Sequence, residues 1–456
     1  LDDIENEQQL NTTSTPSIAE KEIFIADLEA IVKDGTHKPF MSGIIKKGEK
    51  VPCISVSTNP DCKKWFFGMM DYIIKHSKGE PIVYFHNLKY DFTVMLKHIS
   101  PYYSVKKDGQ YYETRIMFKG RKIRLRDSYK IISQPLRKFN KMFQLTNKKE
   151  EAINYAHYDY DNLLTKNSIR KYKKGLSKPD RVKFDEIMGD KKNAKRFEYD
   201  GKYFNALGFY CFYLKQDVMT LYEGLEKFNS LMYDLTKLNS YDYLTISKLA
   251  TEFFISKGCF DDVFMCCGNL RSYLSNAVYG GRVNVQQSIK KKIIDEVLND
   301  LDANSLYPAS FDRMCAEETG LSKGKAKVIT EEHKQYDNLK REEYYIVTVE
   351  ITAINKKQDN PFIQVKNKDG ISDYINDLPN GKAIITTIDK ITLEDYIKFH
   401  EIEYKILKGV YYDGGFNNSI GPICKELYEE RLRIKKANPA MAEMIKLILN
   451  STYGKT

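Results

Sequence analysis

A short apolar run that ends on two acids does most to limit what this chain can fold into. Residues 23–26 are continuously apolar, which is typical of a buried strand. Asp27 and Glu29 follow one residue apart, and residues i and i+2 of a strand point to the same face. The stretch therefore predicts a buried strand that presents two carboxylates on one patch. Taken alone, it is equally compatible with two solvated acids at a strand end.

Two later segments place further acids on helices. Residues 81–85 form a second apolar run, and Asp91 opens an amphipathic helix shortly after it. Tyr213 and Asp217 lie four residues apart in a stretch whose apolar residues recur at helical spacing, so the two side chains share one helix face. An acid at a helix start also interacts favourably with the helix dipole without any ligand. Each of these acids, taken singly, is more often a surface charge.

Composition narrows the class of protein without identifying it. Over 456 residues, 42% are hydrophobic and 29% are charged, which is typical of a globular chain of two to four domains. The excess of 72 Lys and Arg over 62 Asp and Glu gives a net charge of +10, which favours a polyanionic partner. The eight cysteines are scattered and form no C-x-x-C pair, so we expect free thiols in a reducing compartment. No apolar run approaches the ~20 residues that span a bilayer.

Two further stretches carry a resemblance to a known family. Residues 302–308 read D-A-N-S-L-Y-P and follow a short apolar run, so we expect a strand that ends at Asp302 and then a tight turn. Residues 446–454 read K-L-I-L-N-S-T-Y-G. The first stretch resembles motif A (D-x-x-S-L-Y-P) and the second resembles motif B (K-x-x-x-N-S-x-Y-G) of family B DNA polymerases. Both occur in the order of that family.

The acidic segments fit the same resemblance. They are similar to D-x-E, N-x-x-x-D and Y-x-x-x-D, the three exonuclease motifs of proofreading polymerases. The resemblance implies a ribonuclease H-like 3′–5′ exonuclease domain in which carboxylates hold two Mg²⁺ ions about 4 Å apart, with Mn²⁺ as a substitute. Tyr213 would orient the attacking water. The implied metal ligands are Asp27, Glu29, Asp91 and Asp217.

The resemblance also implies residues that bind single-stranded DNA. Residues 125–132 are similar to the S/T-L-x-x-h motif of the same exonucleases, in which the hydroxyl contacts the strand. Ser128 supplies this hydroxyl, whereas Tyr129 stands where the family has leucine. Asn87 and Tyr90 would contribute to the same groove, because aromatic faces stack bases without sequence preference.

A junction motif and the polymerase site complete the likeness. Residues 278–282 resemble Y-x-G-G, which contacts the template between exonuclease and polymerase, although Val278 stands where the family has tyrosine. The implied DNA contacts are Tyr279, Gly280 and Gly281. Asp302 would bind both polymerase metal ions, where positioning and charge stabilisation dominate the chemistry. The implied nucleotide-binding residues are Tyr307, Arg431, Lys435, Lys446, Asn450 and Tyr453.

The expected organisation is a multidomain α/β and α+β chain. The stretch that ends at Asp389 superficially resembles the D-T-D motif, which follows motif B in the family. Here the stretch precedes motif B, so we expect Asp389 to be an acid in a loop or at a helix start. The long interval between motifs A and B matches the inserted subdomain of protein-primed members, whose partners include a terminal protein primer. The expected parts are a disordered tail (1–20), the exonuclease domain (21–230) with a basic insertion (about 160–200), linker helices and the start of the palm (231–310), the inserted subdomain (311–410) and the fingers (411–456).

Three functions follow from the resemblance. The first is a protein-primed DNA polymerase with proofreading exonuclease, which acts on template, primer strand and dNTPs. Motif C and the thumb are absent from the sequence, so the second is a fragment that acts as exonuclease only and does not extend primers. The third is a non-catalytic DNA-binding remnant, against which the intact acids argue. For the basic insertion we prefer a solvated loop over a nucleic-acid contact. Expected locations are a mitochondrial linear plasmid or a viral or cytoplasmic replication site.

Overall fold

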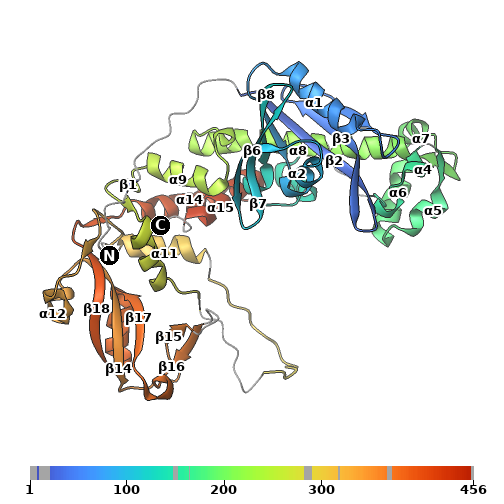
Figure 1. Cartoon of the computed structure of the whole chain (residues 1–456). Coiled ribbons are helices and arrows are strands. Elements are labelled where there is room, and N and C mark those ends of the chain that lie inside the picture. The colour runs from blue at the N-terminus through green and yellow to red at the C-terminus, as the bar shows by residue number, and fades with distance from the viewer. Residues whose placement is uncertain are drawn as a thin grey trace. The chain divides into compact units, whose positions relative to one another are not determined.

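The chain forms two compact units (Figure 1). The computed structural model describes residues 8–9, 21–146, 152–163, 165–281, 290–303, 305–316, 319–366 and 372–452. The larger unit comprises Thr15–Thr251 with Glu429–Lys455, and the smaller unit comprises Leu1–Ser14 with Glu252–Tyr428. None of the described helices is both long and apolar enough to cross a membrane.

A mixed β-sheet forms the centre of the larger unit. Its strand order is β4-β3-β2-β5-β8-β7-β6. β2 pairs in parallel with β5 and β5 in parallel with β8, whereas the outer neighbours are antiparallel. The strands are β2 (Ile23–Lys33), β3 (Thr36–Lys46), β4 (Cys53–Val56), β5 (Ile82–Phe85), β6 (Pro101–Lys107), β7 (Gln110–Phe118) and β8 (Arg121–Asp127).

The alternation of side chains along β2 separates core from site. Phe24, Ala26 and Leu28 are buried in one apolar cluster with residues of α1 (Lys64–His76) and α2 (Leu88–Met95). Because strand side chains alternate between faces, Asp27 and Glu29 point to the opposite face. The prediction of a buried strand carrying both acids is therefore confirmed.

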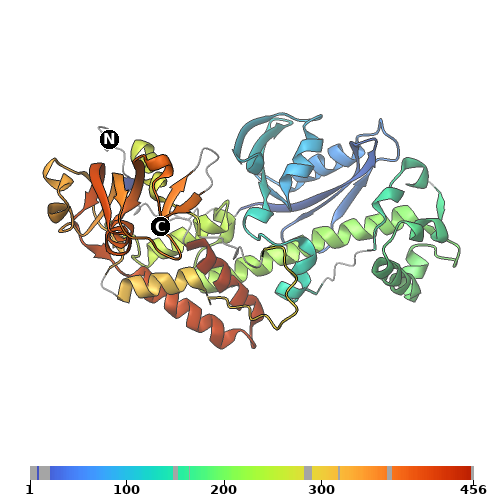
Figure 2. The ribbon, with the colours of Figure 1, turned by 90° about the horizontal axis from the view of Figure 1, so that it is seen from below.

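Helix α8 (Ala206–Thr236) runs along β2 and β3 (Figure 2). Gly43 of β3 lies opposite Asp27 in the strand pairing. A Cβ atom at Gly43 would lie 2.9 Å from Cγ2 of Val218 and 3.0 Å from Cγ of Leu214, both on α8. Glycine at this position therefore allows the helix to approach the strand that carries the acids.

The basic insertion is a folded helical segment, so the expectation of a loop is wrong. The preference for a solvated segment over a nucleic-acid contact stays a prediction. The insertion contains α4 (Tyr160–Leu163), α5 (Ile169–Lys174), α6 (Lys178–Gly189) and α7 (Lys191–Arg196), and β9 (Lys166–Ser168) pairs with β10 (Tyr203–Asn205). The segment orders because aromatic side chains give it a small core of its own, in which rings lie about 5–6 Å apart. These rings are Tyr172, Phe184, Phe204 and Phe209.

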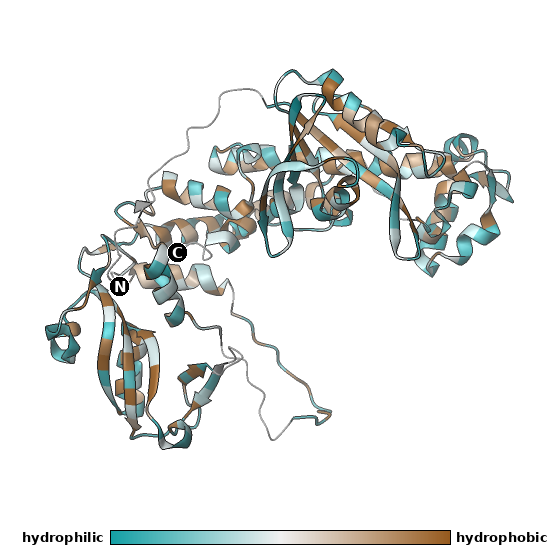
Figure 3. Ribbon diagram, in the orientation of Figure 1, coloured by the Kyte–Doolittle hydropathy of each residue, from teal (hydrophilic) through white to brown (hydrophobic). Residues whose placement is uncertain are grey.

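The smaller unit contains a four-stranded antiparallel sheet, with strand order β13-β18-β14-β17. Hydrophobic residues mark its long strands (Figure 3). The strands are β13 (Lys327–Val328), β14 (Tyr344–Ile354), β17 (Ile384–Asp389) and β18 (Ile402–Tyr412). Asp389 accepts a hydrogen bond from the backbone N–H of Thr392 at the start of α13 (Lys390–Asp395). The prediction that Asp389 is a helix-start acid is therefore confirmed.

Several shorter elements complete the described chain. Gln8 and Gln9, in the tail that we expected to be disordered, form β1 and pair with β11 (Phe264–Met265). The rest of residues 1–20 lies outside the described residues.

The boundaries between exonuclease, palm, inserted subdomain and fingers stay predictions. The remaining helices and strands are α3 (Phe139–Phe143), α9 (Ile246–Ser256), α10 (Gly268–Leu274), α11 (Leu306–Ala316), α12 (Tyr336–Leu339), α14 (Ile420–Ile434), α15 (Pro439–Thr452), β11 (Phe264–Met265), β12 (Leu321–Ser322), β15 (Ile363–Lys366), β16 (Ser372–Ile375) and β19 (Phe416–Asn417).

The expected strand before Asp302 is not present. Residues 297–301 have no regular secondary structure, and the side chains of Val297 and Leu301 are each 93% exposed. A strand requires a neighbour with which to exchange backbone hydrogen bonds, and this segment is not paired with any described strand. The apolar pattern was therefore an insufficient signal for a strand.

Candidate metal centre and nucleic-acid interface

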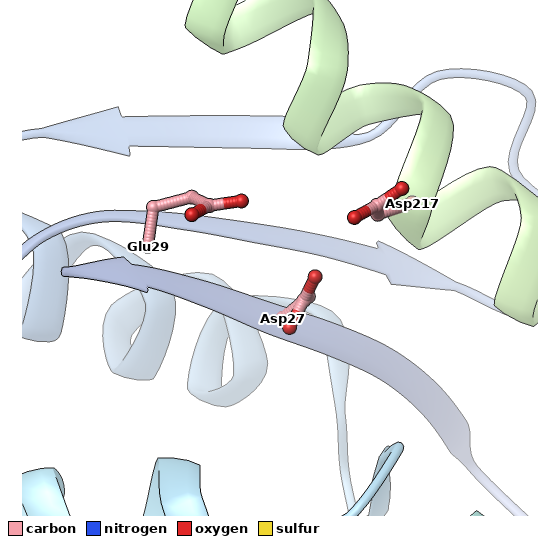
Figure 4. Close-up of side chains that lie close together, drawn as sticks. All are labelled: Asp27, Glu29 and Asp217. Carbon is pink, nitrogen blue, oxygen red and sulfur yellow. The ribbon is translucent and has the colours of Figure 1, made fainter. Parts of the chain in front are cut away.

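Three carboxylates from two elements meet beside the central sheet (Figure 4). Asp27 and Glu29 come from β2 and Asp217 comes from α8. Each offers an oxygen atom within 4.8 Å of the others. Glu29 and Asp217 are buried, and Asp27 is half-buried and accepts a hydrogen bond from the backbone N–H of Leu28. The i, i+2 spacing of the strand and the close approach of α8 together produce this cluster.

A fourth acid, Asp91, lies close enough to Asp27 for their charges to interact. Helix α2 begins at Leu88, so Asp91 lies in its first turn, where it is 3% exposed. Burial, and next the negative charge of Asp27, raise the pKa of Asp91 well above its ordinary value. Its Oδ1 atom is buried and has no hydrogen-bond partner among the described residues. Asp91 is thus electrostatically coupled to Asp27, although it is not part of the group of three within 4.8 Å.

The donor set fits a divalent cation. Carboxylate oxygens are the ligands that Mg²⁺ prefers, and buried carboxylates close to one another repel unless a cation compensates their charge. Burial raises the pKa of Asp91, and its Oδ1 atom has no hydrogen-bond partner among the described residues, so a cation would stabilise the charged form of this carboxyl group.

Two tyrosine hydroxyls lie next to the carboxylates. Tyr213 lies one helical turn before Asp217 on α8 and is buried. Its hydroxyl is hydrogen-bonded to that of Tyr155 over 2.9 Å. Burial raises the pKa of both phenols, and so do nearby acids, Asp217 for Tyr213 and Glu29 for Tyr155. The sequence analysis missed Tyr155, because only the fold of the segment before α4 brings it to this place.

The side chains expected to bind DNA differ in accessibility. Asn87 is exposed in the left-handed region (φ 72°), and Tyr90 is exposed with its hydroxyl bonded to Nδ1 of His37 at 2.9 Å. Ser128 is fully buried, and its hydroxyl donates to the carbonyl of Phe85. The expectation that this hydroxyl faces a DNA strand is therefore not met in the structure.

The Ser128 hydroxyl does not face a DNA strand because it is already hydrogen-bonded to other groups of the protein. Besides its bond to the strand β5 carbonyl, it lies 3.0 Å from Nδ1 of His86, whose other ring nitrogen bonds the carbonyl of Gln134. Tyr129, the next residue, is exposed at the same corner.

The junction motif lies in the smaller unit, next to β17. The hydroxyl of Tyr279 is 2.8 Å from Oγ1 of Thr386, and Lys366 lies over its ring at 4.6 Å from the centroid. Gly280 and Gly281 have open space around them. Tyr279 thus anchors the segment, and the two glycines leave backbone accessible.

The expected polymerase side chains are distributed over both units. In the smaller unit, Asp302 is exposed in an irregular segment, and Tyr307 of α11 is 54% exposed. In the larger unit, α15 packs against α3 and α8. Its Lys446 and Asn450, one helical turn apart, are exposed, as is Lys435, whereas Arg431 is half-buried. Tyr453 lies outside the described residues.

The fold and the cluster define a multidomain α/β protein with a carboxylate site of the kind that binds divalent cations. Residues 74–456 match the family described as DNA polymerase type B, organellar and viral, so the chain belongs to this family of DNA polymerases. The match confirms the resemblance to family B polymerases and the function in DNA synthesis that it implies.

Solved structures of Phi29 DNA polymerase have the same fold. The orthorhombic crystal form matches with a TM-score of 0.62 and 16% identity, covering 95% of this chain and 68% of that chain. The ternary complex with primer-template DNA and incoming nucleotide substrates gives 0.61 and 17%, covering 96% and 68%. The complex with single-stranded DNA gives 0.58 and 16%, covering 96% and 67%. This likeness confirms the expected fold class. A search of curated proteins found no match.

Proposed function

We propose that the larger unit is a 3′–5′ exonuclease that degrades single-stranded DNA with two Mg²⁺ ions, as the proofreading part of a DNA polymerase. The observation that carries this proposal is the meeting of Asp27, Glu29 and Asp217, with oxygen atoms within 4.8 Å of one another. Structures with the same fold hold single-stranded DNA in one case and primer-template DNA in another, which supports DNA as the substrate.

The chain's own residues divide the work of the proposed site. Asp27, Glu29 and Asp217 would hold the ions, and Asp91 would complete the ligand set from the side of α2. When bound, two such ions activate a water molecule and stabilise the leaving oxygen. The hydroxyl of Tyr213, held by its bond to Tyr155, would orient the attacking water. The raised pKa of Tyr213 keeps this hydroxyl protonated and able to donate.

The test is replacement of one ligand. Asp27→Ala should abolish Mg²⁺-dependent degradation of a single-stranded oligonucleotide, because losing charge stabilisation at a phosphoryl-transfer site costs about a thousandfold in rate or more. The matched control is Asp71→Ala, since Asp71 is an exposed acid on α1 that forms an ion pair with Lys119. Unchanged degradation by a folded Asp27→Ala variant would exclude the metal site.

We propose further that the chain is a polymerase of the protein-primed type. A folded sheet, rather than a simple link, separates Asp302 from the motif B helix α15, which supports an inserted subdomain that meets a terminal protein. Asp302 would bind the polymerase metal ions and Tyr307 would pack against the sugar of the nucleotide. Lys446 and Asn450 would bind the triphosphate and the base. Replication of linear DNA in mitochondria or in a virus-infected cell is the setting that we propose.

A further inference from the structure

A buried aspartate joins the turn after β5 to the corner after β8. Asp127 is the last residue of β8 and is 1% exposed. Its Oδ1 atom accepts two backbone hydrogen bonds of 2.9 Å each, one from the N–H of Asn87 and one from the N–H of Tyr129. Asn87 lies 40 residues away in the chain. One oxygen atom therefore connects the β5–α2 turn to the corner after β8.

Each of the two turns held by Asp127 carries an exposed side chain next to buried residues. Asn87 and Tyr129 are both exposed, whereas Ser128 between the strands is fully buried. The left-handed backbone at Asn87 (φ 72°) is an uncommon conformation for a residue with a side chain. It requires support from surrounding contacts, and the bond from its N–H to Asp127 is such a contact.

The Asn87 turn leads directly into α2. Asn87 is the residue before this helix, and its side chain makes no capping hydrogen bond to it. The bond from the N–H of Asn87 to Asp127 therefore supports the turn itself, whereas Asp91 is held within the first turn of the helix. The second carboxylate oxygen of Asp127, Oδ2, has no hydrogen-bond partner among the described residues. It lies 3.9 Å from Nζ of Lys130.

We propose that Asp127 is a positioning residue that holds the Asn87 turn and the Tyr129 corner together as one cradle for a single DNA strand. The inference rests on the proposed exonuclease function, since it assigns the strand-binding part of the same site. Asp127 acts through the backbone of the two turns and does not touch the strand. The exposed phenol of Tyr129 offers a face on which a base can stack, and the geometry of that face depends on the bond from its own N–H to Asp127.

Two substitutions separate this role from others. Asp127→Ala removes both hydrogen bonds, whereas Asp127→Asn keeps an oxygen that can accept them and removes only the charge. We expect Asp127→Ala to raise Kd for a single-stranded oligonucleotide in EDTA, and KM in Mg²⁺, about tenfold or more, with kcat within about threefold, because misplaced binding groups weaken substrate positioning. Asp127→Asn should stay within about threefold of the wild type in all three quantities.

Thr93→Ala is the matched control. Thr93 donates a local hydrogen bond to the carbonyl of Lys89 on the exposed side of α2 and touches neither turn. Its loss should leave Kd and KM unchanged. Thermal unfolding of each variant shows whether the protein is folded under the assay conditions. If Asp127→Ala does not fold, Asp127→Asn still separates the two roles of Asp127, because loss of kcat and of Mg²⁺ binding in this variant would show a metal ligand and overturn the proposal.

The other outcomes overturn the proposal or separate it from the proposed function. If Asp127→Asn lost kcat and bound Mg²⁺ more weakly, Asp127 would be a metal ligand and the positioning role would be wrong. If folded Asp127→Ala kept the wild-type Kd and KM, the hydrogen bonds would serve folding only and the proposal would fail. If the wild type bound the oligonucleotide without degrading it in Mg²⁺, while Asp127→Ala weakened binding and Asp127→Asn restored it, the exonuclease proposal would fail and the cradle would stand.

Discussion

At the scale of single residues, Asp91 is a carboxyl group almost completely removed from water, with 3% of its surface exposed. Burial and the charge of Asp27 raise the pKa of Asp91, so the charged carboxylate destabilises the fold when no cation is bound. A raised carboxyl pKa means that the folded protein binds a proton more tightly than the unfolded chain. Stability therefore falls as the pH rises from the ordinary carboxyl range of about 4 through the raised pKa.

From this environment of Asp91 we predict how the Asp91→Asn substitution changes thermal stability. The neutral amide removes the buried charge, so in EDTA the variant should unfold at a Tm a few °C higher than the wild type at pH 8, since about 1 kcal/mol corresponds to ~2–4 °C for a domain of this size. The difference should disappear below about pH 4, where the carboxyl group becomes protonated in the unfolded chain as well as in the folded protein. Added Mg²⁺ should raise the Tm of the wild type more than that of the variant. A variant that is no more stable than the wild type at pH 8 in EDTA would contradict this account.

At the scale of secondary-structure elements, the contact between β3 and α8 determines whether the carboxylates meet. Asp217 reaches Asp27 only because α8 lies directly against the strand at Gly43. We predict that Gly43→Ala destabilises the larger unit by about 1–3 kcal/mol, the usual cost of overpacking. It should also lower Mg²⁺-dependent nuclease activity, since it displaces α8 and with it Asp217. Urea unfolding and the oligonucleotide assay measure the two effects.

Gly189→Ala is the control for this prediction. Gly189 ends α6, and a Cβ atom there would meet no atom within 4 Å. It should leave both the urea midpoint and the nuclease rate unchanged. If Gly43→Ala lowered stability without affecting the nuclease, the close approach of α8 would be needed for packing and not for the site.

At the scale of the whole molecule, the charge of the chain points to its partner. The net charge is +10, and the family acts on DNA. We predict that binding of a single-stranded oligonucleotide weakens steeply with salt, with log K falling linearly in log salt concentration by about 0.7 for each phosphate neutralised. Fluorescence anisotropy between about 50 and 200 mM NaCl measures this slope. A binding constant that does not change over this range would exclude an electrostatic DNA-binding surface.

The sequence alone was sufficient to predict the acids of the site and the strand and helix that carry them. Asp27 and Glu29 follow from a short apolar run and a period of two, and Asp217 follows from helical spacing, because local periodicity decides which face of an element a side chain occupies. Motifs A and B were sufficient to predict the family of the protein, since the chemistry of phosphoryl transfer restricts which residues stand at those positions.

Only the tertiary structure decided what depends on contacts between distant segments. It brought Asp217 to Asp27 across Gly43, placed the hydroxyl of Tyr155 against that of Tyr213, and buried Ser128 so that its hydroxyl serves the protein. It also left the apolar residues before Asp302 exposed, because a strand forms only when another strand pairs with it. Sequence patterns specify faces and propensities along an element, whereas distances between elements depend on packing that no local pattern contains.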